Sequence, residues 1–104
     1  MPKYRNHLPQ LSGELFLTDG GIETTMIFHE GLNLPFFAAF DLINDPAGQF
    51  VLNKYFHRYC QLACSYKVGF ILEAVTWRAS MDWADKMGYS LQHLDDVWRE
   101  SIEM

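Results

Sequence analysis

The sequence has few of the features that mark nucleic-acid-binding or membrane-spanning proteins. Its 104 residues hold 8 Lys and Arg against 13 Asp and Glu, which gives a net charge of -5, and the basic residues form no run. Nucleic acid and anionic membrane surfaces are therefore poor partners, because both attract positive charge. No stretch approaches the roughly 18 apolar residues that a membrane-spanning helix needs.

Cysteine is also scarce, and the first residues do not resemble a secretory signal. Cys60 and Cys64 stand in one predicted helix, which fits a reducing compartment and no disulfide framework. Residues 1–7 carry charges with no apolar segment behind them. We therefore expect a cytoplasmic protein with neither a nucleic-acid nor a membrane partner.

Two short apolar stretches that end in polar residues stand out. Residues 14–19 predict a strand that ends in Asp19 and is followed by Gly20 and Gly21. The glycines allow a sharp turn or a close approach to a ligand. The aspartate can receive the amino group of a substrate or can order the turn, which is the commoner role of Asp-Gly pairs.

The second stretch covers residues 69–83, and its apolar run from Phe70 to Val75 predicts a buried parallel strand. Thr76 and Trp77 follow at its end, where α/β folds place ligand chemistry. Glu73 lies inside the run, where a charged carboxylate is costly unless it is paired.

Each of these residues also has a structural interpretation. Glu73 either belongs to a site or pairs with Arg78 or a neighbouring strand. Thr76 either lines a site or caps the next helix. For Trp83 and Trp98 we expect packing.

Helices fill most of the remaining sequence. Residues 1–13 predict an arm or a disordered segment, residues 22–30 a short helix, and residues 36–43 a loop or helical turn. Asp45 and Pro46 predict the start of a helix that runs to Lys67. Its predicted apolar face consists of Leu52, Tyr55, Phe56, Tyr59, Ala63 and Tyr66. Ser80 and Ser90 predict the caps of two further helices.

The order strand, helix, strand, helix predicts an α/β fold with parallel strands. A doubly wound sheet shares this order. No Gly-x-Gly-x-x-Gly follows either strand, so we expect no dinucleotide site.

The two strand ends together resemble the homocysteine S-methyltransferase family. In that family the first strand typically ends in Asp-Gly-Gly or Asp-Gly-Ala, as residues 19–21 do. The second typically ends in Glu-Thr-x-Thr and an aromatic residue, where residues 73–77 read Glu-Ala-Val-Thr-Trp. The resemblance runs from Leu15 to Met104. This sequence departs from the family pattern at two places. Ala74 stands where the second motif has its first threonine, and residues 66–68 stand where many members have Ala-Gly.

The resemblance implies a (β/α)8 TIM barrel, a fold that needs about 250 residues. Residues 1–104 then correspond to the N-terminal portion of an incomplete barrel domain, about two β/α units, with residues 1–13 as an arm. The sequence is 49% hydrophobic, which suits a fragment whose apolar faces meet other strands and helices. We expect such a chain, when isolated, to self-associate or to be only partly ordered.

The implied reaction transfers a methyl group to the thiol of homocysteine and gives methionine, a step of methionine biosynthesis. The resemblance places Asp19, Gly20 and Gly21 near the amino group of homocysteine, Thr76 and Trp77 on the pocket wall, and Glu73 at its mouth. Zinc held by three cysteines of the later barrel activates the thiol in this family. Cys60 and Cys64 do not match those ligands.

Two questions stay open at the level of sequence. The methyl donor can be S-methylmethionine, betaine or a folate. The alternative function is a truncated, non-catalytic remnant or interaction module. In either case we predict that residues 1–104 alone hold no stoichiometric, tightly bound zinc and form no methionine from homocysteine. His57, Cys60 and Cys64 share one helix face, but their apolar neighbours favour packing over metal binding.

Overall fold

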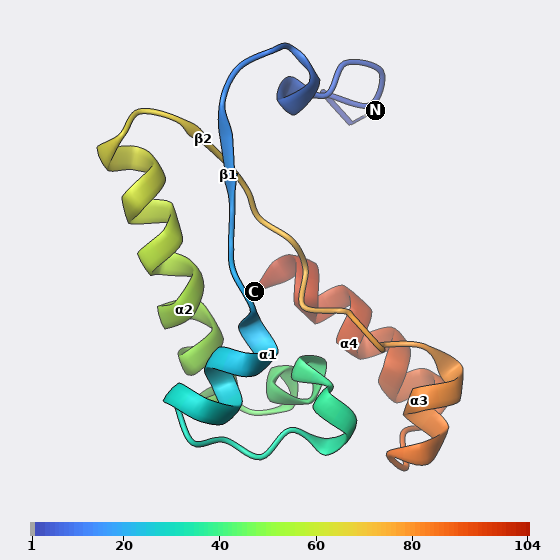
Figure 1. Cartoon of the computed structure of the whole chain (residues 1–104). Helices are drawn as coiled ribbons and strands as arrows, with labels where there is room; N and C mark the ends of the chain where they lie inside the picture. Colours follow the sequence, from blue (N-terminus) through green and yellow to red (C-terminus); the bar gives the residue numbers. More distant parts are fainter. Residues whose placement is uncertain (1) are drawn as a thin grey trace.

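The computed structural model describes residues 2–104, which form a helix-rich α/β unit with a small parallel sheet (Figure 1). The elements are a 3₁₀ helix Pro9–Leu11, β1 Phe16–Thr18, α1 Ile22–Thr24, a π-helical turn Thr25–His29, 3₁₀ helices Pro35–Phe37 and Ala39–Asn44, α2 Pro46–Ser65, β2 Gly69–Ile71, α3 Met81–Lys86 and α4 Leu91–Glu103. The predicted order of strands and long helices is confirmed.

The sheet joins the two predicted strands in parallel. Phe16 lies opposite Gly69, and Thr18 lies opposite Ile71. The helix α2 connects the strands and runs beside them (Figure 1). β2 ends at Ile71, so the prediction of a strand to Val75 was wrong, and Glu73 is exposed outside the strand. The physical reason is that β1 offers β2 a partner over three residues only.

The start of α2 follows its sequence signals, whereas its end does not. The Asp45 side chain accepts a hydrogen bond from the Gly48 amide at 2.7 Å, and Pro46 takes the first helical position. The helix ends at Ser65, and Lys67 adopts a left-handed φ of 55°. Tyr66 is therefore 72% exposed and does not belong to the apolar face, contrary to the prediction.

The two predicted serines directly precede the last two helices, but only one of them caps its helix with its side chain. The Ser90 side chain accepts a hydrogen bond from the His93 amide at 3.1 Å and caps α4. Ser80 occupies the corresponding position before α3, but its side chain makes no capping hydrogen bond. Gly88 separates the helices with a φ of 80°, a conformation that favours glycine.

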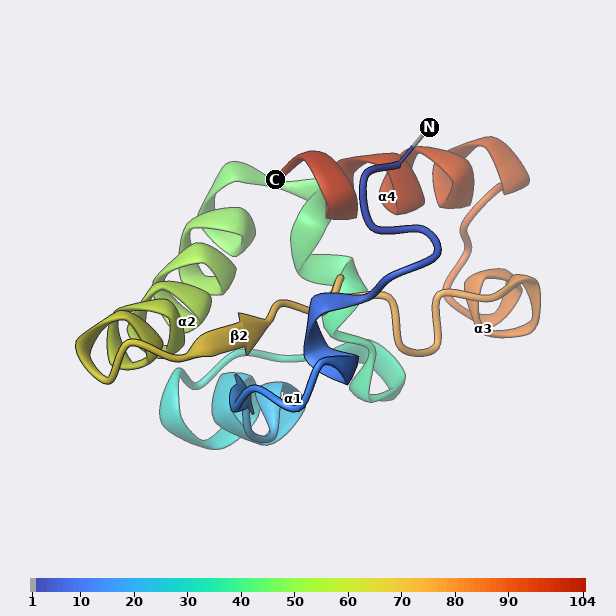
Figure 2. The same cartoon turned by 90° about the horizontal axis from the view of Figure 1, so that it is seen from above.

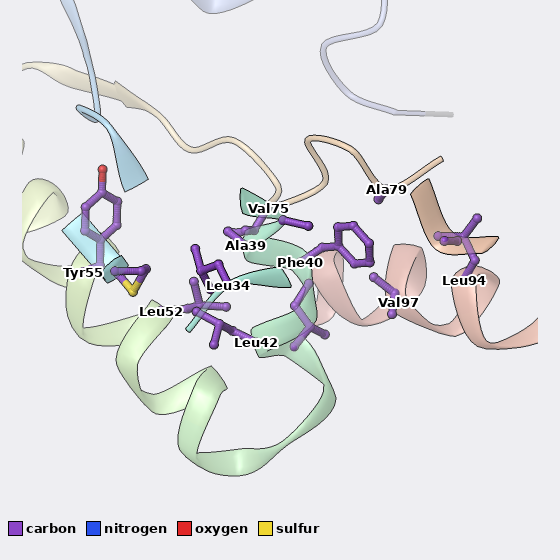
Figure 3. Close-up of a cluster of buried hydrophobic side chains, with 14 of the residues drawn as sticks. Leu34, Ala39, Phe40, Leu42, Leu52, Tyr55, Val75, Ala79, Leu94 and Val97 are labelled. Carbon is purple, nitrogen blue, oxygen red and sulfur yellow. The ribbon is translucent and has the colours of Figure 1, made fainter. Parts of the chain in front are cut away.

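The core lies where the 3₁₀ helix Ala39–Asn44 packs between α2 and α4 (Figure 3). Figure 3 shows Phe40 directed toward α4, where Val97 and Leu94 lie. The largest fully buried side chains are Phe40, Met26, Ile43, Leu52, Leu94 and Val97. The Trp98 indole nitrogen donates to the Ala79 carbonyl at 2.9 Å, but the side chain is 39% exposed and lies outside the core, contrary to the expected packing role.

The sheet is covered less completely than the helices. Figure 2 shows β2 beside α2, with α3 at the opposite side of the molecule. All three residues of β2 are only partly buried, and the neighbouring Leu15 and Leu72 are 65% and 61% exposed. Among the helices of residues 2–104, none combines the length and the apolar character of a membrane span.

Candidate functional site

A cleft of about 430 Å³ lies at the carboxyl ends of β1 and β2. Parallel strands that end at the same edge bring their following residues together, and this is where α/β folds bind ligands. The cleft holds five of the six predicted site residues, namely Asp19, Gly20, Glu73, Thr76 and Trp77. Gly21 lies next to it in sequence and does not line it.

Asp19 is held in place by a residue of α2. The Tyr55 hydroxyl donates a hydrogen bond to Asp19 Oδ2 at 2.8 Å. Oδ1 accepts no hydrogen bond within residues 2–104, and Asp19 lines the cleft. Burial, and then the hydrogen bond to Asp19, raise the pKa of Tyr55 well above its usual range, so the phenol stays protonated and donates.

The two glycines serve different purposes. A Cβ atom at Gly20 would lie 2.9 Å from the Tyr59 hydroxyl, so this position requires a small residue unless Tyr59 moves. Gly21 precedes α1, and its carbonyl accepts a hydrogen bond from the Thr25 hydroxyl at 2.9 Å. Gly20 thus packs against Tyr59 and also lines the cleft, whereas Gly21 supports the start of α1.

Glu73 reaches the cleft from the segment after β2. It is exposed and forms no ion pair with any residue that the structure describes. The predicted alternative, a pair with Arg78, was wrong. Arg78 instead stacks between two tryptophans, with its guanidinium carbon 4.4 Å from the Trp77 ring centre and 4.2 Å from that of Trp83.

Thr76 and Trp77 form one wall. The Thr76 carbonyl accepts a hydrogen bond from the Ala79 amide at 2.9 Å, which closes a turn before α3. Thr76 does not cap α3, because that helix begins at Met81. Trp77 is 57% exposed, and its contact with Arg78 orients the ring at the cleft.

The sequence interpretation missed two residues that matter here. Tyr55 was assigned only to the apolar face of α2, although its hydroxyl orients Asp19. Glu23, in the first turn of α1, also lines the cleft. Its position shortly after the Asp-Gly-Gly turn was the available signal, because a helix that starts there turns its first residues toward the strand ends.

Nothing in the described part of the chain fits a zinc ion. No three His, Cys, Asp or Glu side chains of residues 2–104 gather closely enough to hold a metal. Cys60 is partly buried and Cys64 is exposed on α2, away from the cleft lining. The zinc of the resembled family therefore stays an expectation, and no step is assigned to it.

Comparison of the chain with protein-family models, with curated proteins and with solved structures gives no match. The resemblance in sequence motifs and the geometry of the cleft are thus the grounds for a function.

Proposed function

We propose that this chain forms the amino-acid end of a homocysteine pocket, in an enzyme that transfers a methyl group to the homocysteine thiol and produces methionine. The supporting observation is the convergence of Asp19 and the segment 73–77 on one cleft at the carboxyl ends of parallel strands. We further propose that the two β/α units are the N-terminal portion of a (β/α)8 barrel.

The charges in the cleft suit the ammonium group of an amino acid. Asp19, Glu23 and Glu73 line it, and no Lys or Arg does. Tyr55 fixes one carboxylate oxygen of Asp19, and the other has no hydrogen-bond partner within residues 2–104. A carboxylate held in this way loses little rotamer freedom when a cation binds, and a charge-assisted hydrogen bond is stronger than a neutral one.

The thiol end of the substrate is not accounted for by these residues. Activation of the thiol and delivery of the methyl group require groups that the cleft does not contain. The proposal therefore assigns binding and orientation to this chain, with S-methylmethionine, betaine or a folate as the candidate donors.

The test is a titration of the whole chain with L-homocysteine, followed through the backbone amide NMR signals of residues 19–23 and 73–77. We expect saturable shifts, and a weakening by roughly tenfold to a hundredfold in Asp19→Ala, because a hydrogen bond to a charged group contributes about 1.5–3 kcal/mol. Asp85→Ala, at an exposed aspartate of α3, is the matched control. Unchanged binding with a lower melting temperature in Asp19→Ala would assign Asp19 to the turn alone.

A second candidate, a non-catalytic interaction module, is favoured by the amount of exposed surface. The accessible surface is 7333 Å², whereas a compact protein of this mass exposes roughly 6,000 Å². The radius of gyration is 15.2 Å, against about 13 Å for a compact domain of this length. Self-association in sedimentation experiments, together with no response to homocysteine, would favour this function over the first.

A further inference from the structure

A second pocket, of about 330 Å³, lies between the π-helical turn Thr25–His29 and α2. Two elements supply its walls. The residues that line it are Thr25, His29, Tyr55, Arg58, Tyr59 and Leu62. None of the proposed homocysteine-binding residues belongs to it, so an inference from this pocket does not depend on the proposed function.

The charge of this pocket is opposite to that of the chain. The sequence carries a net charge of -5, yet no Asp or Glu lines the pocket, and Arg58 does. The Arg58 side chain makes no hydrogen bond or ion pair with any other residue that the structure describes. Its guanidinium group is therefore available to a ligand.

The nearby carboxylates already have partners. Asp19 accepts a hydrogen bond from Tyr55 at 2.8 Å. Glu30, which follows His29, forms an ion pair with Lys54 at 3.1 Å. Lys54 therefore balances the charge of Glu30. The Tyr55 phenol is neutral, so Asp19 keeps its negative charge, but Asp19 does not line this pocket.

The backbone at this pocket is itself unusual. The Glu30 amide donates to the Thr25 carbonyl at 3.0 Å, which is the hydrogen bond of a π-helical turn. Such turns are rare and occur often at functional sites. Here the turn places both Thr25 and His29 in the pocket wall opposite α2.

We propose that this pocket binds an oxyanion, a phosphate or a carboxylate, carried by a small ligand whose apolar part lies over Leu62. The planar guanidinium of Arg58 matches two oxygens of such a group, and His29 adds a further donor. Tyr55 lines this pocket and its hydroxyl donates to Asp19, so a ligand bound here contacts the residue that orients Asp19.

Titrations of the whole chain with sodium phosphate, and separately with sodium acetate, test this site. Ionic strength is held constant with sodium chloride, because screening alone shifts exposed charges. We expect saturable changes in the amide signals of residues 25–29 and 55–62 with at least one of the two anions. Saturation by phosphate only, by acetate only or by both identifies the oxyanion class.

Two variants and one control decide the outcome. Arg58→Gln removes an exposed cation and should weaken anion binding by about tenfold or more, and His29→Gln should weaken it less. Arg99→Gln, the same change at an exposed arginine of α4, should leave binding unchanged. Changes that do not saturate with either anion, or equal affinities in Arg58→Gln and Arg99→Gln, would overturn the proposal.

Discussion

The helical part of the molecule and its sheet differ sharply in how much of their apolar surface is covered. Phe40, Ile43 and Leu94 are fully buried between the 3₁₀ helix, α2 and α4. Leu15 and Leu72, at the ends of the two strands, are more than half exposed. The difference indicates that packing of the helices stabilises the fold, while the sheet keeps apolar surface available for contacts.

Backbone hydrogen bonding explains the difference. A helix satisfies most of its amides and carbonyls within itself, whereas a strand needs neighbours on both sides. β1 and β2 pair over three residues and have no other strand beside them within residues 2–104. A two-stranded sheet of this kind is marginal without further cover. The following substitutions test this contrast.

The largest effect is expected in the helical core. Phe40→Ala should lower the free energy of unfolding by about 3–5 kcal/mol, because it removes a fully buried aromatic side chain and leaves a cavity. Leu72→Ala, at an exposed leucine beside β2, should change it by less than about 0.5 kcal/mol. Urea denaturation measures both. Similar losses in the two variants would mean that the sheet contributes as much as the helical core.

Substitutions at two glycines compare how tightly the helical region and the sheet are packed. A Cβ atom at Gly48 would lie 2.1 Å from the Leu42 carbonyl oxygen, which belongs to rigid backbone. A Cβ atom at Gly69 would lie 2.3 Å from Cε1 of Phe16, a side chain that can rotate away.

Gly48→Ala should therefore destabilise the protein by about 3 kcal/mol, and Gly69→Ala by about 1 kcal/mol, as measured by thermal and urea unfolding. The reverse order would show that the sheet is the more tightly packed region.

The smallest loss of stability is expected at the hydrogen bond that links the helix α2 to the end of β1. Tyr55→Phe removes the hydrogen bond to Asp19 and should cost about 1 kcal/mol at neutral pH. Burial and this bond raise the pKa of Tyr55 above its ordinary value of about 10. Unfolding lets the phenol ionise, so its contribution is complete below pH 10 and is lost as the pH rises further.

Urea unfolding between pH 8 and pH 11 measures this dependence. Tyr55→Phe should lose less stability than the wild type above pH 10. Tyr89→Phe is the matched variant in the helical region, because burial, and then the hydrogen bond from Tyr89 to Asp41 at 2.5 Å, raise the pKa of Tyr89 as well. Parallel pH curves for Tyr55→Phe and the wild type would contradict the assignment.

Local signals in the sequence predicted the parts of the fold that depend on local contacts. Asp45 and Ser90 cap helices as expected, because the donor of each bond lies three positions along the chain. The polar ends of both strands converge on one cleft, as parallel strands require. Five of the six candidate site residues therefore line this cleft.

Long-range contacts explain the failures. The length of β2 is set by its partner, so its apolar run alone overestimated it. Arg78 adopts a left-handed φ of 65°, and its side chain donates to the Phe36 carbonyl at 2.6 Å. Its stacking partners Trp77 and Trp83 are near in sequence, but the contact with Phe36 lies 42 positions away and could not be read from the sequence neighbours. The role of Tyr55 likewise depends on how α2 meets β1.

In the sequence, α2 lies between β1 and β2, and this order affects how the chain folds. A helix of this length forms in about a microsecond from local contacts, whereas β1 must meet β2 across the whole intervening chain. Closing that loop costs conformational entropy. The hydrogen bonds of three paired positions offset only a small part of this cost. We therefore expect the strands to pair after α2 has formed and has shortened the distance between them. Until the strands pair, Asp19 and Glu73 are not held near each other.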